Sequence, residues 1–298
     1  GNLAVLMGGT GSEREISLQS GQAVLAALEN LGIAAISLDL GADFVSQLQR
    51  SKLDTAFIAL HGSYGENGVL QAVLESLNIA YTGSDMPACA LAMDKWRSQL
   101  VWQSTGINTP TSILLNSDNL SQAGQLGFPL AVKPASEGSS IGISKVTADT
   151  QLLAAYNLAA KYDKNVIAQQ WISGKELVVG IVNNQPLPVI EIKTSREFYD
   201  YAAKYNSDTT QYISAHGLNA VQVKQLQDVA MDAFYSLGCA NYGRVDLILD
   251  AEGKAYVIEV NTIPGMTSHS LLPMAAKASG MELEQLVRSM LANIYATK

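Results

Sequence analysis

The first ninety-odd residues alternate between short apolar runs and longer amphipathic segments, and this alternation constrains the fold more than any other feature. Apolar runs at residues 3–7, 34–40, 55–61 and 79–82 predict strands, and residues 13–31, 42–53 and 68–77 predict helices between them. Ser12 is the expected N-cap of the first helix, and Gly32 follows its end. Strands that alternate with helices pair in parallel and are covered on both faces. We therefore expect a parallel α/β domain over residues 1–95.

A different pattern follows. Residues 88–105 predict one long helix, and Thr109-Pro110-Thr111 then breaks the chain. Strands expected at residues 112–115, 129–133, 141–146 and 166–172, with a helix at 149–162, form a smaller α+β unit over residues 96–175. A third α+β unit over residues 176–298 has strands at 177–182, 187–192, 245–249 and 255–260 and helices at 219–237 and 283–295. The predicted fold class is thus α/β, with one parallel domain followed by two α+β domains.

Composition excludes several classes of protein. The chain of 298 residues has a formal net charge of −8, which argues against a nucleic-acid partner but still allows a few lysines to gather in one cleft. No apolar run approaches the roughly 20 residues of a membrane span, and no secretory signal opens the sequence. We expect a cytoplasmic protein with no membrane partner. Cys89 and Cys239 are expected to be buried reduced thiols, with a disulfide or metal pair as the alternative.

The segment Gly8-Gly9-Thr10-Gly11-Ser12-Glu13-Arg14-Glu15 lies between the first predicted strand and helix. A helix start favours an anion, but Glu13 and Glu15 would repel a pyrophosphate and suit an ammonium group. The three-glycine dinucleotide fingerprint does not fit. Acidic residues that only complement the helix dipole are the alternative. A Walker A loop is also absent, because neither Gly-Lys pair in the sequence is followed by Ser or Thr.

A second candidate is the segment 131–142, in which Lys133 ends an apolar strand and a loop rich in Gly and Ser follows. The amides of such a loop can fold over phosphates while the lysine supplies positive charge. An ordinary hairpin with a surface lysine is the alternative.

The third candidate is a pair of strands, Gly243–Leu249 and Tyr256–Thr262. Alternate side chains of a strand share a face, so Arg244 lies beside Asp246 and Glu259 beside Asn261. If the two strands are neighbours, Asp246, Glu259 and Asn261 surround one point. Their hard oxygen atoms suit Mg²⁺ that bridges phosphates. A buried ion pair between Asp246 and Arg244 is the alternative.

Two further segments are candidates for substrate contacts. Backbone amides near Ser270 and Leu271 could receive a carboxylate at a helix start, although helix capping by Ser268 or Ser270 is equally consistent. His61 follows a strand of the parallel sheet, where ligands gather. No spacing among the histidines indicates zinc.

In order along the chain, these segments resemble the ATP-grasp superfamily and, within it, the D-alanine–D-alanine ligase family. One block would be weak support, but the ordered set is very specific and covers essentially the whole chain. The blocks that carry the resemblance are Gly8-Gly9-Thr10 with Ser12–Glu15, Ala59–Gly62 with Gly65–Gly68, Tyr81–Ser84, Ala92–Lys95, Val132–Pro134 with Glu137–Gly142, Phe198–Tyr201 with Ala203–Tyr205, Gly243–Asp246, and Glu259–Thr262 with Pro264–Thr267.

The resemblance implies a clasp of two α+β domains around ATP. It assigns the phosphates to Lys95, Lys133 and Lys204, and the loop that covers ATP to Ser139 and Ser140. Glu176 would hold the ribose, and the backbone of Trp171 and Ile172 would lie near adenine. Two Mg²⁺ ions, or Mn²⁺ as a substitute, would be held by Asp246, Glu259 and Asn261. Gln169 departs from the glutamate that the family often has at the adenine end, which puts nucleobase selectivity in doubt.

The resemblance also implies ligation of two D-alanine molecules through an acyl phosphate, for peptidoglycan precursor synthesis, by a homodimer. Glu13, linked to Ser139 and Tyr205, matches the group that binds the ammonium of the first substrate. Ser270 and Leu271 match the residues that bind the carboxylate of the second substrate, and Arg244 with the Gly265 amide matches the groups that stabilise the oxyanion. Apart from the resemblance, we expect His61 and Glu66 to support the residues near the first substrate. Residues 195–214 would form a closing lid.

Tyr205 favours D-alanine over a hydroxy acid as second substrate, because relatives that make D-alanyl-D-lactate carry phenylalanine there. Another ATP-grasp carboxylate–amine ligase is the first alternative. A catalytically silent nucleotide-binding protein is the second, and its mark would be the loss of Arg244, Asp246 or Glu259, all of which are present.

Overall fold

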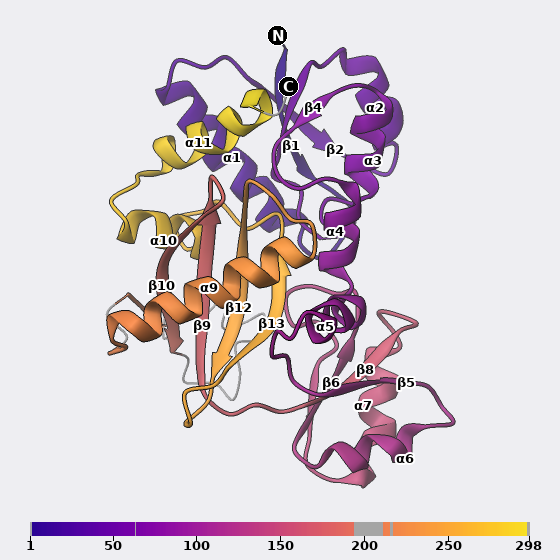
Figure 1. The fold of residues 1–298 in the computed structure, drawn as a ribbon. Helices are drawn as coiled ribbons and strands as arrows, with labels where there is room; N and C mark the ends of the chain where they lie inside the picture. The colour runs from indigo at the N-terminus through magenta and orange to yellow at the C-terminus, as the bar shows by residue number, and fades with distance from the viewer. Residues whose placement is uncertain (1, 63, 194–210, 215–216, 297–298) are drawn as a thin grey trace.

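Three sheets follow one another along the chain in the computed structural model, which describes residues 2–62, 64–193, 211–214 and 217–296 (Figure 1). The first sheet is parallel, and the other two are antiparallel. Each sheet falls within one of the three segments expected from the sequence, apart from one residue at the start of the third sheet. The exact domain limits stay a prediction. Within the described residues, no helix combines the length and the apolar character needed to cross a membrane.

The first sheet has the strand order β2-β1-β3-β4. Its strands are β1 (Leu3–Gly8), β2 (Ile36–Leu40), β3 (Thr55–Ile58) and β4 (Ala80–Tyr81). They alternate with helices α1 (Arg14–Asn30), α2 (Phe44–Ser51) and α3 (Val69–Ser76). The parallel pairing predicted from the alternating pattern is confirmed.

Helix α1 is held against β1 by residues spaced at helical intervals. Its buried positions are Ser17, Ser20, Gly21, Val24, Ala27 and Leu28, which form one stripe. A Cβ atom at Gly21 would lie 2.6 Å from the Met7 side chain, so a glycine allows helix and strand to approach closely. The expected Ser12 cap is wrong: Glu13 is the N-cap residue and makes no side-chain capping bond.

The second sheet has the order β5-β8-β6-β7. It comprises β5 (Ser112–Leu115), β6 (Leu130–Pro134), β7 (Ser144–Val146) and β8 (Val166–Gln170). Four short helices accompany it: α6 (Leu120–Ala123), the 3₁₀ turns η1 (Gly124–Leu126) and η2 (Asp149–Gln151), and α7 (Leu152–Ala159).

The expected single helix over residues 88–105 is wrong. It is two helices, α4 (Met86–Met93) and α5 (Lys95–Ser104), which meet at Asp94. Asp94 has an extended backbone, and its carboxylate accepts the Arg97 N–H, so it ends one helix and caps the next. Ala88, Ala92 and Trp102 of these helices pack into the core of the third sheet.

The third sheet has the order β11-β10-β9-β12-β13. Its strands are β9 (Lys175–Val182), β10 (Gln185–Lys193), β11 (Gln211–Ile213), β12 (Tyr242–Leu249) and β13 (Ala255–Asn261). Helix α9 (Ala220–Ser236) covers one face, and α10 (Leu271–Ala278) and α11 (Leu283–Ala296) lie on the other (Figure 1).

The central strand β9 is apolar from Leu177 to Val182 because both of its faces are buried there. Val179 and Ile181 pack with α9, whereas Val178 and Val182 belong to the core on the opposite face. Each such side chain contributes about 1.5–3 kcal/mol of transfer free energy. That opposite core also contains residues of β1, α1 and α11, so the first and last parts of the chain share one core.

Candidate active site

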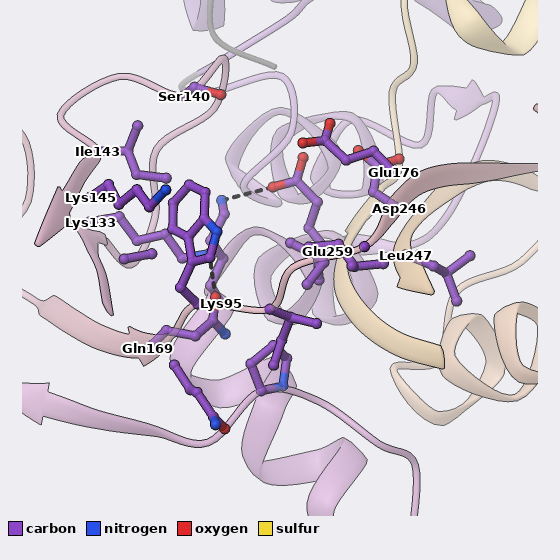
Figure 2. A pocket seen from close by; sticks show the side chains of 18 of the residues that line it. Lys95, Lys133, Ser140, Ile143, Lys145, Gln169, Glu176, Asp246, Leu247 and Glu259 are labelled. Carbon is purple, nitrogen blue, oxygen red and sulfur yellow. Dashed lines mark hydrogen bonds and ion pairs between the residues drawn. The ribbon is translucent and has the colours of Figure 1, made fainter. Parts of the chain in front are cut away.

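A cavity of about 420 Å³ lies between the second and third sheets. Lysines and acidic residues line part of it, and apolar side chains line the rest (Figure 2). The polar set comprises Lys95, Lys133, Glu137, Lys145, Glu176, Asp246 and Glu259, and the apolar set includes Ile143, Trp171, Ile172 and Leu247. The Lys145 ammonium lies 4.6 Å from the centre of the Trp171 ring, a cation–π contact. Such a lining suits a planar ring carrying a polyanion.

A second cavity of about 1150 Å³ lies between the first and third sheets. Its lining includes Glu13, His61, Glu66, Ser139, Arg244, Asn261, Gly265, Ser270 and Leu271. Lys95 and Glu259 line both cavities. The ammonium of Lys95 is 3.3 Å from a Glu259 oxygen and 2.7 Å from the Glu137 carbonyl, which accepts its hydrogen bond. This ion pair, drawn in Figure 2, therefore marks the junction of the two cavities.

The Glu13 carboxylate is held at the wall of the larger cavity. Ser139 Oγ donates to Glu13 Oε1 over 2.5 Å, and both side chains are buried. Ser139 and Ser140 both have left-handed backbones, with φ of 51° and 59°. Gly62 has φ of +74°, and a Cβ atom there would lie 2.9 Å from the Glu13 carboxylate. The loop and this glycine together enclose Glu13.

A chain of polar contacts runs behind the larger cavity. His61 Nδ1 lies 3.4 Å from Glu66 Oε1, and His61 Nε2 lies 2.9 Å from Ser20 Oγ. Ser20 Oγ also accepts the backbone N–H of Met266 over 3.1 Å. The loop after β13, which contains Gly265, is thereby anchored to α1.

Arg244 and Asp246 form the ion pair that the sequence left as the alternative. Arg244 Nε and Nη2 donate to the two Asp246 oxygens over 2.6 and 2.9 Å. The strand pairing places Asp246 opposite Glu259 and Arg244 opposite Asn261, as expected from neighbouring strands. Asn261 Oδ1 accepts the Ile263 N–H over 2.9 Å. Two carboxylates and a guanidinium therefore gather at the edge where the cavities meet.

Two family models match the chain. The one described as D-ala D-ala ligase C-terminus matches residues 101–292, and the one described as D-ala D-ala ligase N-terminus matches residues 41–84. The chain belongs to the D-alanine–D-alanine ligase family.

Similar proteins extend this match over nearly the whole chain. A D-alanine–D-alanine ligase from Pseudomonas entomophila is 48% identical over 100% of this chain and 94% of its own length. One from Pseudomonas fluorescens is 50% identical over 98% and 91%. A solved D-alanine–D-alanine ligase from Bacillus anthracis, complexed with ATP, is 31% identical and covers 99% of this chain and 98% of its own, with a TM-score of 0.86. The α/β ATP-grasp fold is confirmed by this likeness.

The structure brings most of the residues singled out in the sequence to the two cavities. The smaller cavity receives Lys95, Lys133, Ser140, Trp171, Ile172, Glu176, Asp246 and Glu259. The larger receives Glu13, His61, Ser139, Arg244, Asn261, Gly265, Ser270 and Leu271. Lys204, Tyr205 and most of the expected lid lie outside the described residues. The roles of all these residues stay predictions.

Ser270 occupies the N-cap position of α10, but its side chain makes no capping bond. Its hydroxyl instead accepts the Thr267 N–H over 3.1 Å, and Thr267 Oγ1 lies 2.9 Å from it. Of the two expectations for this segment, helix capping and carboxylate binding, the structure therefore does not show capping by the Ser270 side chain.

Three residues at the site were missed from the sequence. Lys145 lies over Trp171, Ser20 joins His61 to Met266, and Glu137 lends its carbonyl to Lys95. Burial raises the pKa of the Glu137 carboxyl, and nearby Lys95 opposes that shift. No local sequence pattern signals these contacts, because each of them joins segments that are distant in the chain.

Proposed function

We propose that this chain joins two D-alanine molecules to D-alanyl-D-alanine with the conversion of ATP to ADP and phosphate. The observation that carries the proposal is the junction of the two cavities at Lys95 and Glu259. A nucleotide held in the smaller cavity would present its terminal phosphate at the wall of the larger one, where two amino acids fit. The ATP in a solved relative of the same fold supports the choice of nucleotide.

The chemistry follows from the weak electrophilicity of a carboxylate. An oxygen of the first D-alanine carboxylate attacks the γ-phosphorus, the bond to ADP breaks, and an acyl phosphate forms. Lys95 and Lys133 offset the charge that develops on the transferred group. The Glu13 carboxylate, held by Ser139, is placed to bind the ammonium of this first substrate.

The amine of the second D-alanine, once it has lost a proton, then attacks the acyl carbon. The tetrahedral oxygen gains charge as the new bond forms, and Arg244 with the Gly265 amide would stabilise it. Phosphate leaves with the electrons of the acyl–oxygen bond. The Ser270 and Leu271 amides at the start of α10 would hold the second carboxylate, as a helix N-terminus favours an anion. The site thus mainly orients, shields from water and stabilises charge.

The residues at the cavity junction fit Mg²⁺. Asp246, Glu259 and Asn261 offer hard oxygen atoms from two paired strands. Within the described ranges, no three His, Cys, Asp or Glu side chains gather as a metal-binding group. The set proposed here has two carboxylates, and its third member, Asn261, is an amide. Arg244 and Lys95 now neutralise the two carboxylates. Bound Mg²⁺ would supply charge neutralisation for the phosphates.

The test is ADP release with ATP, Mg²⁺ and D-alanine, run beside L-alanine, D-serine and D-lactate. We expect release with D-alanine alone, together with D-alanyl-D-alanine. Release that requires D-serine or D-lactate as well would keep the chemistry and overturn the second substrate, and D-serine is pertinent because a solved D-Ala:D-Ser ligase from Enterococcus faecalis has a TM-score of 0.86. No release with any of them would overturn the proposal.

The magnesium assignment has its own test. Asp246→Asn keeps the size of the side chain but removes a charge, so Mg²⁺-dependent ADP binding should weaken about tenfold or more. Binding that depends on Mg²⁺ as in the wild type would contradict the assignment. A role in peptidoglycan precursor synthesis follows from the same reaction. The homodimer also remains part of the proposal, and light scattering of the purified protein tests it.

A further inference from the structure

Gln169 is a buried amide in the wall of the smaller cavity. It lies in β8, between β5 and β6, and its side chain is 3% exposed. Figure 2 shows it on the side that carries Lys133 and Lys145, across from Asp246 and Leu247. Unlike Lys95 and Glu259, it lines only the smaller cavity. It shares this cavity with the apolar residues Ile143, Trp171 and Leu247.

The orientation of this amide is fixed by its neighbour. Lys133 Nζ donates to Gln169 Oε1 over 2.8 Å, and both side chains are buried. An ammonium has donors and no acceptor, so it must face the amide oxygen. A flipped amide would point N–H groups at the ammonium, and the contact would become repulsive. Lys133 thus turns the Nε2 end of Gln169 away from itself.

The Nε2 atom has no hydrogen-bond partner in the described structure although it is buried. A buried donor without an acceptor costs free energy. A ligand that supplies an acceptor removes this cost when it binds, and its affinity rises accordingly. The apolar residues Ile143, Ile172 and Leu247 of the same cavity favour a planar ring as that ligand. The edge of a purine offers ring nitrogens, and in a 6-oxo purine also a carbonyl oxygen.

We infer that Gln169 is a specificity-determining residue that reads the nucleobase as a hydrogen-bond donor, so that the site accepts a 6-oxo purine nucleotide nearly as well as an adenine nucleotide. The inference rests on the proposed nucleotide site. A carboxylate in the same place is acceptor-only. It would bind the adenine amino group and repel a carbonyl oxygen, so the residue type decides the preference.

Titration of the purified full-length chain with ADP and with inosine diphosphate, both with Mg²⁺, tests the nucleobase preference without any amino-acid substrate. We expect the two dissociation constants of the wild type to agree within about tenfold, and Gln169→Glu to shift their ratio toward ADP by about tenfold or more. A wild type that prefers ADP by about a hundredfold, or a variant with an unchanged ratio, would overturn the inference.

Two further variants separate the causes. Gln125→Glu places the same charge at an exposed residue of η1 that lines neither cavity, and should leave the ratio as in the wild type. An equal shift in both variants would attribute the effect to charge alone and overturn the inference. Gln169→Met keeps the length but removes the donor, so both diphosphates should bind about tenfold more weakly, and unchanged binding would contradict the role of Nε2.

Failure of the inference differs from failure of the proposed function. ADP that binds while inosine diphosphate does not would refute the donor role alone. Absence of binding for both would refute the nucleotide site, and with it the proposed ligation.

Discussion

Ser20 offers a test of whether the polar chain behind the larger cavity supports catalysis or only folding. Its hydroxyl accepts the Met266 N–H and contacts His61 Nε2. Because His61 Nδ1 faces the Glu66 carboxylate, we assign the ring proton to Nδ1, and Ser20 then donates to Nε2. Ser20→Ala leaves both groups buried without a partner.

The magnitude follows from those two lost bonds. An unsatisfied buried group costs about 1–3 kcal/mol, so the loss of two partners should lower the free energy of unfolding by about 2–6 kcal/mol. The Gly265 loop also loses its anchor on α1. If its amide stabilises the oxyanion, kcat should fall about tenfold, which corresponds to about 1.4 kcal/mol of transition-state stabilisation.

Ser17→Ala is the matched control, one turn earlier on the same helix. The Ser17 hydroxyl also makes two buried hydrogen bonds, accepting from Gly8 N–H over 2.9 Å and donating to the Ala59 carbonyl over 2.7 Å. Urea unfolding should show similar losses of stability in both variants. ADP release should fall only in Ser20→Ala, and equal turnover in the two variants would refute a catalytic contribution.

Two other predictions concern packing and pH. A Cβ atom at Gly65 would lie 1.8 Å from the Leu60 carbonyl oxygen, so Gly65→Ala should lower the free energy of unfolding by about 3 kcal/mol or more. Gly253→Ala meets nothing within 4 Å, and its loss in the same urea titration should stay near the roughly 1–2 kcal/mol of a left-handed backbone. Burial raises the pKa of the Cys89 thiol to about 12 and also raises that of Cys239. Both thiols should therefore resist Ellman's reagent at neutral pH until the protein unfolds. Because folding raises the pKa of both thiols, their contribution to the free energy of unfolding is fully present below the unfolded thiol pKa of about 8.5. That contribution is lost as the pH rises from there toward the pKa values of the folded protein. Cys89→Ala should flatten that loss, and rapid reaction of the native thiols would contradict the burial argument.

Much of the fold could be predicted because its signals are local. The alternation of apolar runs and helices gives the parallel sheet, and side-chain alternation in two strands places Asp246 opposite Glu259. The break at Asp94 was missed because the apolar period continues through it, whereas a single extended residue ends the helix. A cap inside a periodic segment leaves little trace in the pattern.

The contacts that complete the site were beyond local patterns. The ion pair of Lys95 with Glu259 and the bond from Lys133 to Gln169 join separate elements. Their existence depends on how α5 packs on the third sheet and how β6 pairs with β8. Sequence spacing names such residues as candidates, but only the tertiary arrangement decides which of them meet.

The core shared by the first and last helices has a consequence for synthesis. Leu286 and Met290 of α11 pack with Val5 and Val24 of the first domain. A ribosome adds about 5–20 residues each second, so this part of the first domain waits tens of seconds for its covering helix. Until then its apolar surface is exposed to other nascent chains. We expect ribosome-associated chaperones to bind the emerging protein, and folding to finish only after translation has passed α11.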